Sequence, residues 1–209
     1  MAKRFKVTIR FTEDVLGSVS TLPVYQAYQA QTAMANGKYV ADEMETLIDQ
    51  RKGRTAFHRD GNTPILYDYV VKGHMKESWR ACRQMPGSAS AKLSAGKSKI
   101  DMLVHIYPRR IALKLRKPTV DNERPLRADT PQGPRVTVVA SEAAQAGTIM
   151  EFEVLCLAPD VIGEKLVKEW LSNGQYVGLG QWRSGGYGRF VVESFVESFE
   201  EVAAQAEAA

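Results

Sequence analysis

Two stretches of the chain alternate apolar and polar residues with a period of two. Every second residue is apolar from Phe5 to Phe11, and the same alternation runs through 149–157. A period of two is typical of strands that bury one face, so we expect a strand in each stretch. Shorter apolar runs predict further strands at 135–140 and 190–195. The apolar positions therefore indicate several half-buried strands that share one core.

A spacing of three to four residues predicts a helix over 72–85. Met75, Trp79 and Cys82 recur at spacings of four and three, which places their side chains on one helix face. Pro86-Gly87 is expected to end this helix, because proline lacks the backbone N–H that a helix needs.

A second helix is predicted after Pro159, with Asp160 as its N-cap and Asn173-Gly174 at its C-cap. Its spacing is helical throughout, and the predicted buried face consists of Ile162, Leu166, Val167, Trp170 and Leu171. A helix with one apolar face of this kind is expected to pack on a sheet.

The segments between these elements carry turn-forming residues. We expect a loop over 12–24, and two short helices over 25–51 that are broken at Asn36-Gly37. A turn at 59–62 predicts a hairpin with arms near 54–58 and 65–71.

Three further segments have compositions that do not predict a core. Residues 87–99 are mostly Ser, Ala, Gly and Lys, so we expect a mobile basic loop. A strand-like run at 104–115 is interrupted by Pro108, which predicts an edge strand or a bend. Residues 116–134, rich in proline and charge, are expected to form a long projecting loop or hairpin.

This order of elements favours an α+β fold, in which a sheet of the ferredoxin-like βαββαβ type carries helices on one face. We expect one domain over 1–196, enlarged by a helical insertion at 25–56 and a thumb-like segment at 116–134. The acidic tail, 197–209, has few apolar residues and is expected to be flexible.

The composition is that of a globular protein, with 44% hydrophobic and 25% charged residues. No apolar run approaches the roughly 18 residues needed to cross a bilayer, and the basic start leads into alternating residues. We therefore expect a cytoplasmic protein that makes no membrane contact. Cys82 and Cys156 lack metal-ligand spacing and are expected to be buried thiols, and the sequence predicts neither a metal site nor a cofactor. The adjacent acids Glu13 and Asp14 are expected to be solvated.

The net charge of +4 hides an uneven distribution. Residues 193–209 contain five Glu and no Lys or Arg, whereas 72–135 contain 15 basic and five acidic residues, a net charge of +10. So basic a block suggests a polyanionic partner, most often nucleic acid. A solvated basic face without a partner remains the alternative.

The candidate binding residues fall into two groups. Four cations recur at helical spacing in the predicted helix and two more follow it: Lys72, Lys76, Arg80, Arg83, Lys97 and Lys99. The second group is a stretch with glycines at Gly178, Gly180, Gly185, Gly186 and Gly188, among which stand Trp182, Arg183, Tyr187 and Arg189. Aromatic rings and guanidinium groups together are typical of single-strand binding, and the glycines would let backbone amides approach phosphate. The alternative is a tight turn whose aromatic side chains fill the core.

Four segments, in this order, resemble the RAMP superfamily, in particular the backbone subunits of type III CRISPR effector complexes. They are the opening strand with the loop that ends at Pro23-Val24, RDGNTPILYDYVVKGHMKESWR at 59–80, AGTIMEFEV at 146–154, and the helix followed by GGYGR at 185–189. The resemblance implies an RNA-bound array of subunits. It also implies that Arg124 and Arg127, on the long 116–134 loop, act as a thumb that separates bases.

The chain departs from the family pattern at several positions. Glu77 stands in place of a glycine, and Gly185 in place of the loop arginine, although Arg183 lies two residues earlier. Family members that cut target RNA resemble one another in an aspartate shortly before Pro-Val, where this chain has Thr21 and Leu22. Cleavage of that kind is therefore not expected.

The leading hypothesis is a non-catalytic protein that binds single-stranded nucleic acid, RNA in preference to DNA. It would assemble with copies of itself, or with other effector-complex subunits, along the strand. One alternative is a metal-independent endoribonuclease with His74 as general acid or base, chosen over His58 and His105 because it precedes Lys76 at the helix start. Another is a structural or adaptor protein of a tailed phage, whose genomes encode uncharacterised proteins that look similar.

Overall fold

The computed structural model describes residues 1–20, 54–130 and 133–198. Its central unit is an antiparallel sheet in which β1 (Lys3–Phe11) lies between β11 (Ile149–Cys156) and β12 (Phe190–Ser198). On the other side of β11 lies β7 (Val104–Tyr107), which gives the order β12-β1-β11-β7. The alternation that predicted the first strand is the burial pattern observed, since Phe5, Val7, Ile9 and Phe11 are all buried.

The chain bends after β7, at residues 108–109, and the peptide bond between Tyr107 and Pro108 is cis. After the bend, β8 (Arg110–Lys114) pairs with the start of β11 and with β6 (Thr63–Tyr67). The outermost strand, β5 (His58–Asp60), forms a hairpin with β6 around Gly61, as the turn residues predicted. The predicted bend at Pro108 is therefore confirmed.

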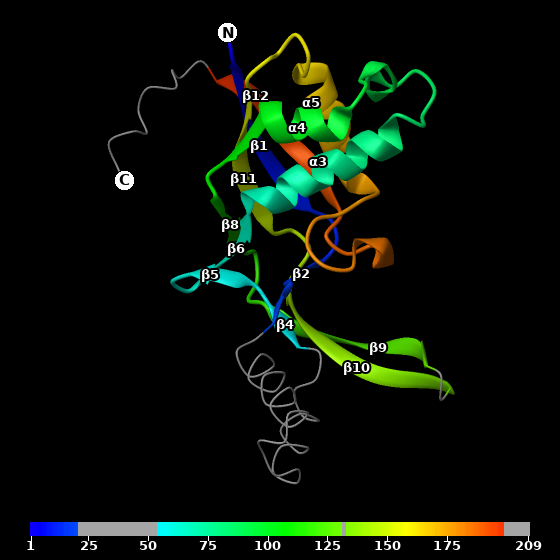
Figure 1. Ribbon diagram of the computed structural model, residues 1–209. Helices are drawn as coiled ribbons and strands as arrows, with labels where there is room; N and C mark the ends of the chain where they lie inside the picture. The colour runs from blue at the N-terminus through cyan, green and yellow to red at the C-terminus, as the bar shows by residue number, and fades with distance from the viewer. Residues whose placement is uncertain (21–53, 131–132, 199–209) are drawn as a thin grey trace, which may run out of the picture.

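Three helices, α3 (Asp68–Cys82), α4 (Gly96–Leu103) and α5 (Glu164–Ser172), cover one face of this sheet (Figure 1). Their apolar faces meet the inner side chains of the strands in one core, which contains Met75 and Trp170 at 0% exposure. The mixed α+β class predicted from the sequence is confirmed. The sheet residues that alternate with this core include the charged residues Arg4, Lys6, Glu151 and Glu153.

A second, smaller sheet carries the most prominent projection of the molecule. Strand β9 (Val120–Thr130) pairs along its whole length with β10 (Gly133–Ala144), and this hairpin extends away from the body (Figure 1). At its base, β10 also pairs with β2 (Val15–Leu16) and β4 (Thr55–Ala56), and β4 pairs with β3 (Val19–Ser20). The projecting segment is thus a regular hairpin, and part of the predicted 12–24 loop is strand.

The prediction of a mobile basic loop at 87–99 is wrong. The segment forms a 3-10 turn, η1 (Ala89–Lys92), and then the start of α4, with Ser90 and Leu93 buried. The carboxylate of Glu169, on α5, accepts hydrogen bonds from the backbone N–H groups of Ala89 (2.7 Å) and Ser90 (3.0 Å). Small residues are needed here because a side chain at Gly96 would run into the ring of Trp79. The segment cannot form a core of its own, and it is ordered by its contacts with Glu169 and Trp79.

Helix boundaries also differ from prediction. Helix α3 begins at Asp68 directly after β6, four residues earlier than predicted, and ends at Cys82. Asp160 is exposed in a turn and is not an N-cap. Helix α5 begins after Gly163, where a Cβ would lie 2.8 Å from the carbonyl oxygen of Pro159. At the other end, Asn173 is the C-cap as predicted, and the chain continues into the 3-10 turn η2 (Asn173–Gln175).

The predicted helices at 25–51 lie outside the described residues, and the end of the predicted helical insertion at 25–56 is strand β4. Of the predicted flexible tail at 197–209, the first two residues belong to β12 and the rest lies outside the described residues. Among the helices that the structure describes, none has the length and apolar character to cross a membrane.

Candidate nucleic-acid interface

Four of the predicted cationic residues line one pocket on the helical side of the molecule. The pocket has a volume of about 300 Å³, and its cations are Lys76, Arg80, Lys97 and Arg183, with Gly73, Glu77 and Trp79 completing the wall. We call this the cationic pocket. Helix α3, helix α4 and the glycine-rich loop each contribute to it, so the fold gathers residues that are far apart in sequence.

The local structure explains why the pocket is open. Lys76 and Arg80 are about one helical turn apart on the exposed face of α3. Gly73 lies on the same helix three residues before Lys76, and a Cβ added to it would meet no atom within 4 Å. The space above this glycine is therefore part of the pocket.

Two carboxylates hold the cations in place. The Nζ atom of Lys76 lies 2.8 Å from Oδ1 of Asp101 on α4, and Arg183 donates a hydrogen bond to Glu77. Lys72 donates to the backbone carbonyl of Asp101 at 2.9 Å, and partial burial lowers its pKa. Since Glu77 is the one acidic residue among the described residues that line the pocket, the charge balance of the pocket stays positive. This arrangement suits an anion such as a phosphate.

A second group of predicted residues meets where the glycine-rich loop contacts the hairpin. Trp182 and Tyr187 stack with ring centres 5.4 Å apart and an angle of 16° between the planes. The guanidinium of Arg124, on β9, lies 4.5 Å from the Trp182 ring centre and 5.9 Å from that of Tyr187. Asn122 adds an acceptor, 3.4 Å from the Tyr187 hydroxyl. We call these four residues the Arg124 bracket.

This geometry corrects the role expected for Arg124. The residue is only 7% exposed, and burial lowers the pKa of its guanidinium. It lies near the base of the hairpin against the glycine-rich loop, where it fastens the two together and does not project as a thumb tip would. Arg127, three residues further along β9, is exposed.

Several glycines serve the protein's own packing. Gly178 and Gly188 face each other so closely that a side chain on either would run into backbone atoms of the other arm of the loop. The N–H of Leu179 donates to the Gly188 carbonyl at 2.9 Å, and the Gly188 N–H donates to the Asp14 carbonyl at 2.8 Å. Gly180 approaches the Leu16 carbonyl in the same way. At these positions the glycines allow close contact within the chain. These contacts account for the glycines without a bound phosphate.

The remaining predicted residues lie outside both groups. The Arg83 guanidinium lies 5.2 Å from the Trp79 ring centre, and Lys99 is on α4, where its N–H donates to the Ala95 carbonyl at 3.1 Å. Arg189 is exposed just before β12, and its carbonyl accepts from the Thr12 N–H at 2.8 Å. Gly185 borders the Trp182 side chain, and Gly186 borders that of Arg189.

His74 is a core residue. Its side chain is 0% exposed, and its Nε2 lies 3.1 Å from the Trp170 carbonyl oxygen and 3.2 Å from Oγ of Ser78. Burial lowers its pKa to about 4, so the ring is neutral at pH 7. A buried neutral imidazole does not reach a substrate, and the suggested catalytic role for His74 is at odds with this position.

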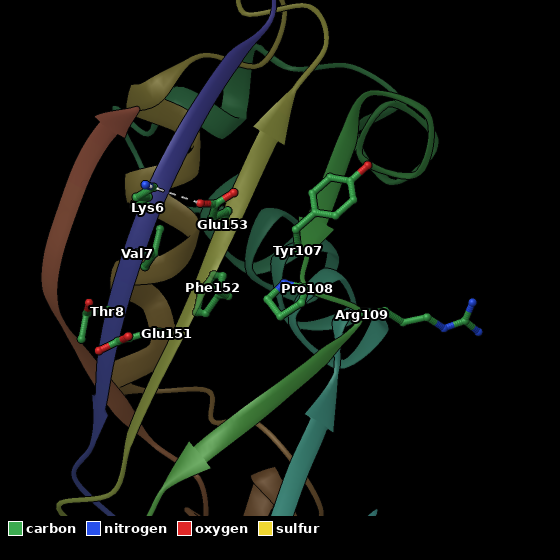
Figure 2. Close-up of a pocket in the computed structure, with 9 residues that line it drawn as sticks. All are labelled: Lys6, Val7, Thr8, Tyr107, Pro108, Arg109, Glu151, Phe152 and Glu153. Atoms are coloured by element: carbon green, nitrogen blue, oxygen red, sulfur yellow. Dashed lines mark ion pairs between the residues drawn. The ribbon is translucent and has the colours of Figure 1, made fainter. Parts of the chain in front are cut away.

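Carboxylates lie among the cations on the opposite face of the sheet. Cross-strand ion pairs join Arg4 to Glu153 at 2.7 Å and Lys114 to Glu151 at 2.6 Å. A broad hollow of about 690 Å³ lies among β1, β11 and the bend at Pro108, and Figure 2 shows the two glutamates within it, with the helices behind the sheet. These carboxylates make this face a poor site for a polyanion.

One group of aromatic residues was missed by the sequence analysis. Tyr67 and Tyr69 stack where β6 passes into α3, with ring centres 5.4 Å apart, and the His58 and Tyr67 rings make an edge-to-face contact with centres 4.7 Å apart. The signal was hidden because the predicted helix began at residue 72, which left Tyr69 outside the helix. With the observed start, Tyr69 and Lys72 lie on adjoining turns of one face.

The comparisons with known proteins bear on the fold. No protein-family model and no curated protein matches the chain. Among solved structures, a chain of the type III-B Cmr-beta complex bound to cognate target RNA matches with a TM-score of 0.57 and 14% sequence identity. The match covers 94% of this chain and 60% of the Cmr-beta chain. This chain therefore spans less than two thirds of the length of the Cmr-beta chain. The likeness shows a shared fold.

Proposed function

We propose that the protein is a non-catalytic subunit of an RNA-containing complex, and that it holds single-stranded RNA on the helical side of the sheet. The observation that carries the proposal is the cationic pocket, where α3, α4 and the glycine-rich loop bring four cations together around space for an anion. Cationic sites of this kind bind the backbone of the strand and tolerate different sequences.

The topology and the structural likeness support the same proposal. The order β12-β1-β11-β7, with α3 before β7 and α5 before β12, supports a ferredoxin-like βαββαβ sheet. We propose that residues 1–196 form one such domain of the RAMP type. The similar chain belongs to an effector complex described as bound to target RNA, which favours RNA over DNA as the ligand.

The projecting hairpin supports assembly with a neighbouring subunit. Val136 and Val138 are 68% and 59% exposed and lie on one face of β10, two residues apart. Exposed apolar residues grouped on a projecting element are typical of protein contacts. We propose that the hairpin packs against the next copy, or another subunit, along the RNA. Mass photometry with RNA of increasing length tests this, because the number of bound copies should rise stepwise.

The central experiment reverses charge in the cationic pocket. A variant with Lys76→Glu and Arg80→Glu should bind a labelled single-stranded RNA more than about tenfold more weakly in fluorescence anisotropy. For this variant, the slope of log Kd against log salt concentration should decrease by about 0.7 for each phosphate that the variant no longer neutralises.

The matched control makes the same change in net charge on the other side of the sheet. Lys6→Glu with Lys114→Glu alters residues on β1 and β8, away from the pocket. The control should leave the affinity close to that of the unaltered protein. Equal weakening by both variants, or none by the pocket variant, would contradict a phosphate site in the cationic pocket.

The endoribonuclease alternative has no support from its best candidate, because His74 is inaccessible. Incubation of the RNA with the protein in EDTA should leave it intact. Cleavage that persists in a His74→Gln variant would point to another residue.

A further inference from the structure

The exposed tyrosine at the start of α3 has the features of a stacking surface. Tyr69 is 59% exposed, although one face of its ring is covered by Tyr67 at 5.4 Å with 13° between the planes. Tyr67 is itself held by an edge-to-face contact with the His58 ring, with 78° between the planes. The outer tyrosine is thus held in one orientation by two rings from the β5–β6 hairpin.

The position of Tyr69 continues the line of cations on α3. Tyr69, Lys72 and Lys76 are separated by three and four residues, so they lie along one exposed side of the helix. At 1.5 Å per residue, Lys76 lies roughly 10 Å from Tyr69 along the helix axis. A ligand that fills the cationic pocket can therefore reach the ring over two helical turns.

Cations also lie on the other side of the tyrosine pair. The N–H of Asp68 donates to the carbonyl of Arg109 at 3.0 Å, and Arg110 is the strand partner of Tyr67. Both arginine residues are exposed, and Figure 2 shows Arg109 at the edge of the sheet hollow with its guanidinium directed away from Glu151 and Glu153. Arg110 lies 3.8 Å from a carboxylate oxygen of Asp60, and Arg109 and Lys72 also place positive charge near the aromatic surface, which favours an aromatic ligand that carries negative charge.

We infer that Tyr69 is a stacking site for one nucleobase of the single strand whose phosphates lie in the cationic pocket. This inference rests on the proposed function and adds a second contact to it. A flat ring held in place by its neighbours loses little conformational freedom when a base stacks on it, and every base offers a π face. The site therefore contributes affinity with little dependence on sequence.

The test separates stacking from charge. Tyr69→Ala should weaken binding of a uniform-length single-stranded RNA by about tenfold, whereas Tyr69→Phe should retain the affinity, because the phenyl ring still stacks. Neither change removes a cation, so the slope of log Kd against log salt should stay that of the unaltered protein. Tyr176→Ala, at a tyrosine that is 63% exposed after α5, is the matched control and should leave Kd unchanged.

A second measurement locates the stacked base on the RNA. It uses a series of oligonucleotides that each lack the base at one position. At one of these positions, loss of the base should weaken binding to the unaltered protein and should not further weaken binding to the Tyr69→Ala variant. Unchanged affinity of Tyr69→Ala, with the normal salt slope, would overturn the stacking site and leave the proposed function standing. Absence of RNA binding by the unaltered protein would overturn both.

Discussion

The guanidinium of Arg124 lies 4.5 Å from the centre of the Trp182 ring. This interaction joins β9 of the projecting hairpin to the glycine-rich loop, and the loop in turn contributes Arg183 to the cationic pocket. The hairpin and the pocket are therefore connected through one buried cation and two aromatic rings. A change in the orientation of the hairpin is therefore expected to move Arg183 in the cationic pocket, and the reverse.

Removing the cation should loosen the hairpin. We expect Arg124→Ala to lower the free energy of unfolding by about 1–2 kcal/mol, because alanine cannot replace a desolvated cation–π interaction. Hydrogen exchange should increase in β9 near its base and in 182–187. Lys117→Ala, at an exposed cation just before β9, is the control and should change neither quantity. Unaltered exchange in Arg124→Ala would show that the Arg124 bracket does not hold the hairpin.

Glu77 is expected to restrain binding of an anion in the pocket. Glu77→Gln releases Arg183 from its carboxylate partner and should tighten RNA binding by about two- to fivefold, in line with the size of exposed ion pairs. Glu151→Gln makes the same change of charge on the opposite sheet face, where the partner is Lys114. Fluorescence anisotropy at low salt compares the two; equal tightening would mean that only total charge matters.

Two glycines should respond to alanine in opposite directions. Gly73 is helical with open space around it, so Gly73→Ala should raise the free energy of unfolding by about 0.5–1 kcal/mol. Gly188 has a φ of +69° and lies against the backbone of Leu179, so Gly188→Ala should lower it by more than ~1 kcal/mol. Chemical denaturation measures both. Stabilisation by both variants would contradict the loop geometry described above.

The buried histidine should make stability depend on pH. Burial lowers the pKa of His74 to about 4, so between pH 6.5 and 4 the unfolded chain binds a proton that the folded chain does not. Stability should therefore fall as the pH is lowered through this range, by on the order of 3 kcal/mol in total. Above pH 6.5 this contribution is constant.

A His74→Gln variant should lack this part of the pH dependence, as measured by urea unfolding at pH 7 and pH 4.5. His105→Gln on β7 is the control and should keep it. If the two variants showed the same slope, the dependence would come from other groups.

The two cysteines are expected to be unreactive in the folded protein. Burial raises the pKa of the Cys156 thiol to about 12 and also raises that of Cys82, so little thiolate forms at pH 8. A thiol reagent such as DTNB should react with neither until denaturant is added. Rapid reaction of one thiol in native buffer would show that its part of the core opens readily.

The strands were predictable because their signal is local. Period-two alternation identified β1 and β11 from residues next to one another in sequence, and the apolar spacing of Met75 and Trp79 identified α3. The segment at 87–99 was misjudged because the groups that order it are distant. Glu169 and Trp79 supply its hydrogen bonds and its packing, and no property of the segment itself reveals them.

The candidate site was predictable in its residue types but not in its grouping. Helical spacing placed Lys76 and Arg80 together, while Lys97 and Arg183 joined them only through the packing of α4 and the glycine-rich loop. Arg124 was misplaced because a cation in a charged, proline-rich segment gives no sign that it will be buried. The strand register and the loop fold decide this, and both depend on contacts between distant parts of the chain.

The central position of β1 has a consequence for synthesis on the ribosome. Its two neighbours, β11 and β12, are among the last elements to be translated, so the first strand emerges long before either partner exists. The sheet cannot close while the chain grows, and folding must wait for contacts between distant parts of the chain, which slows it. A nascent chain that stops before 149 leaves both edges of β1 unpaired and open to aggregation.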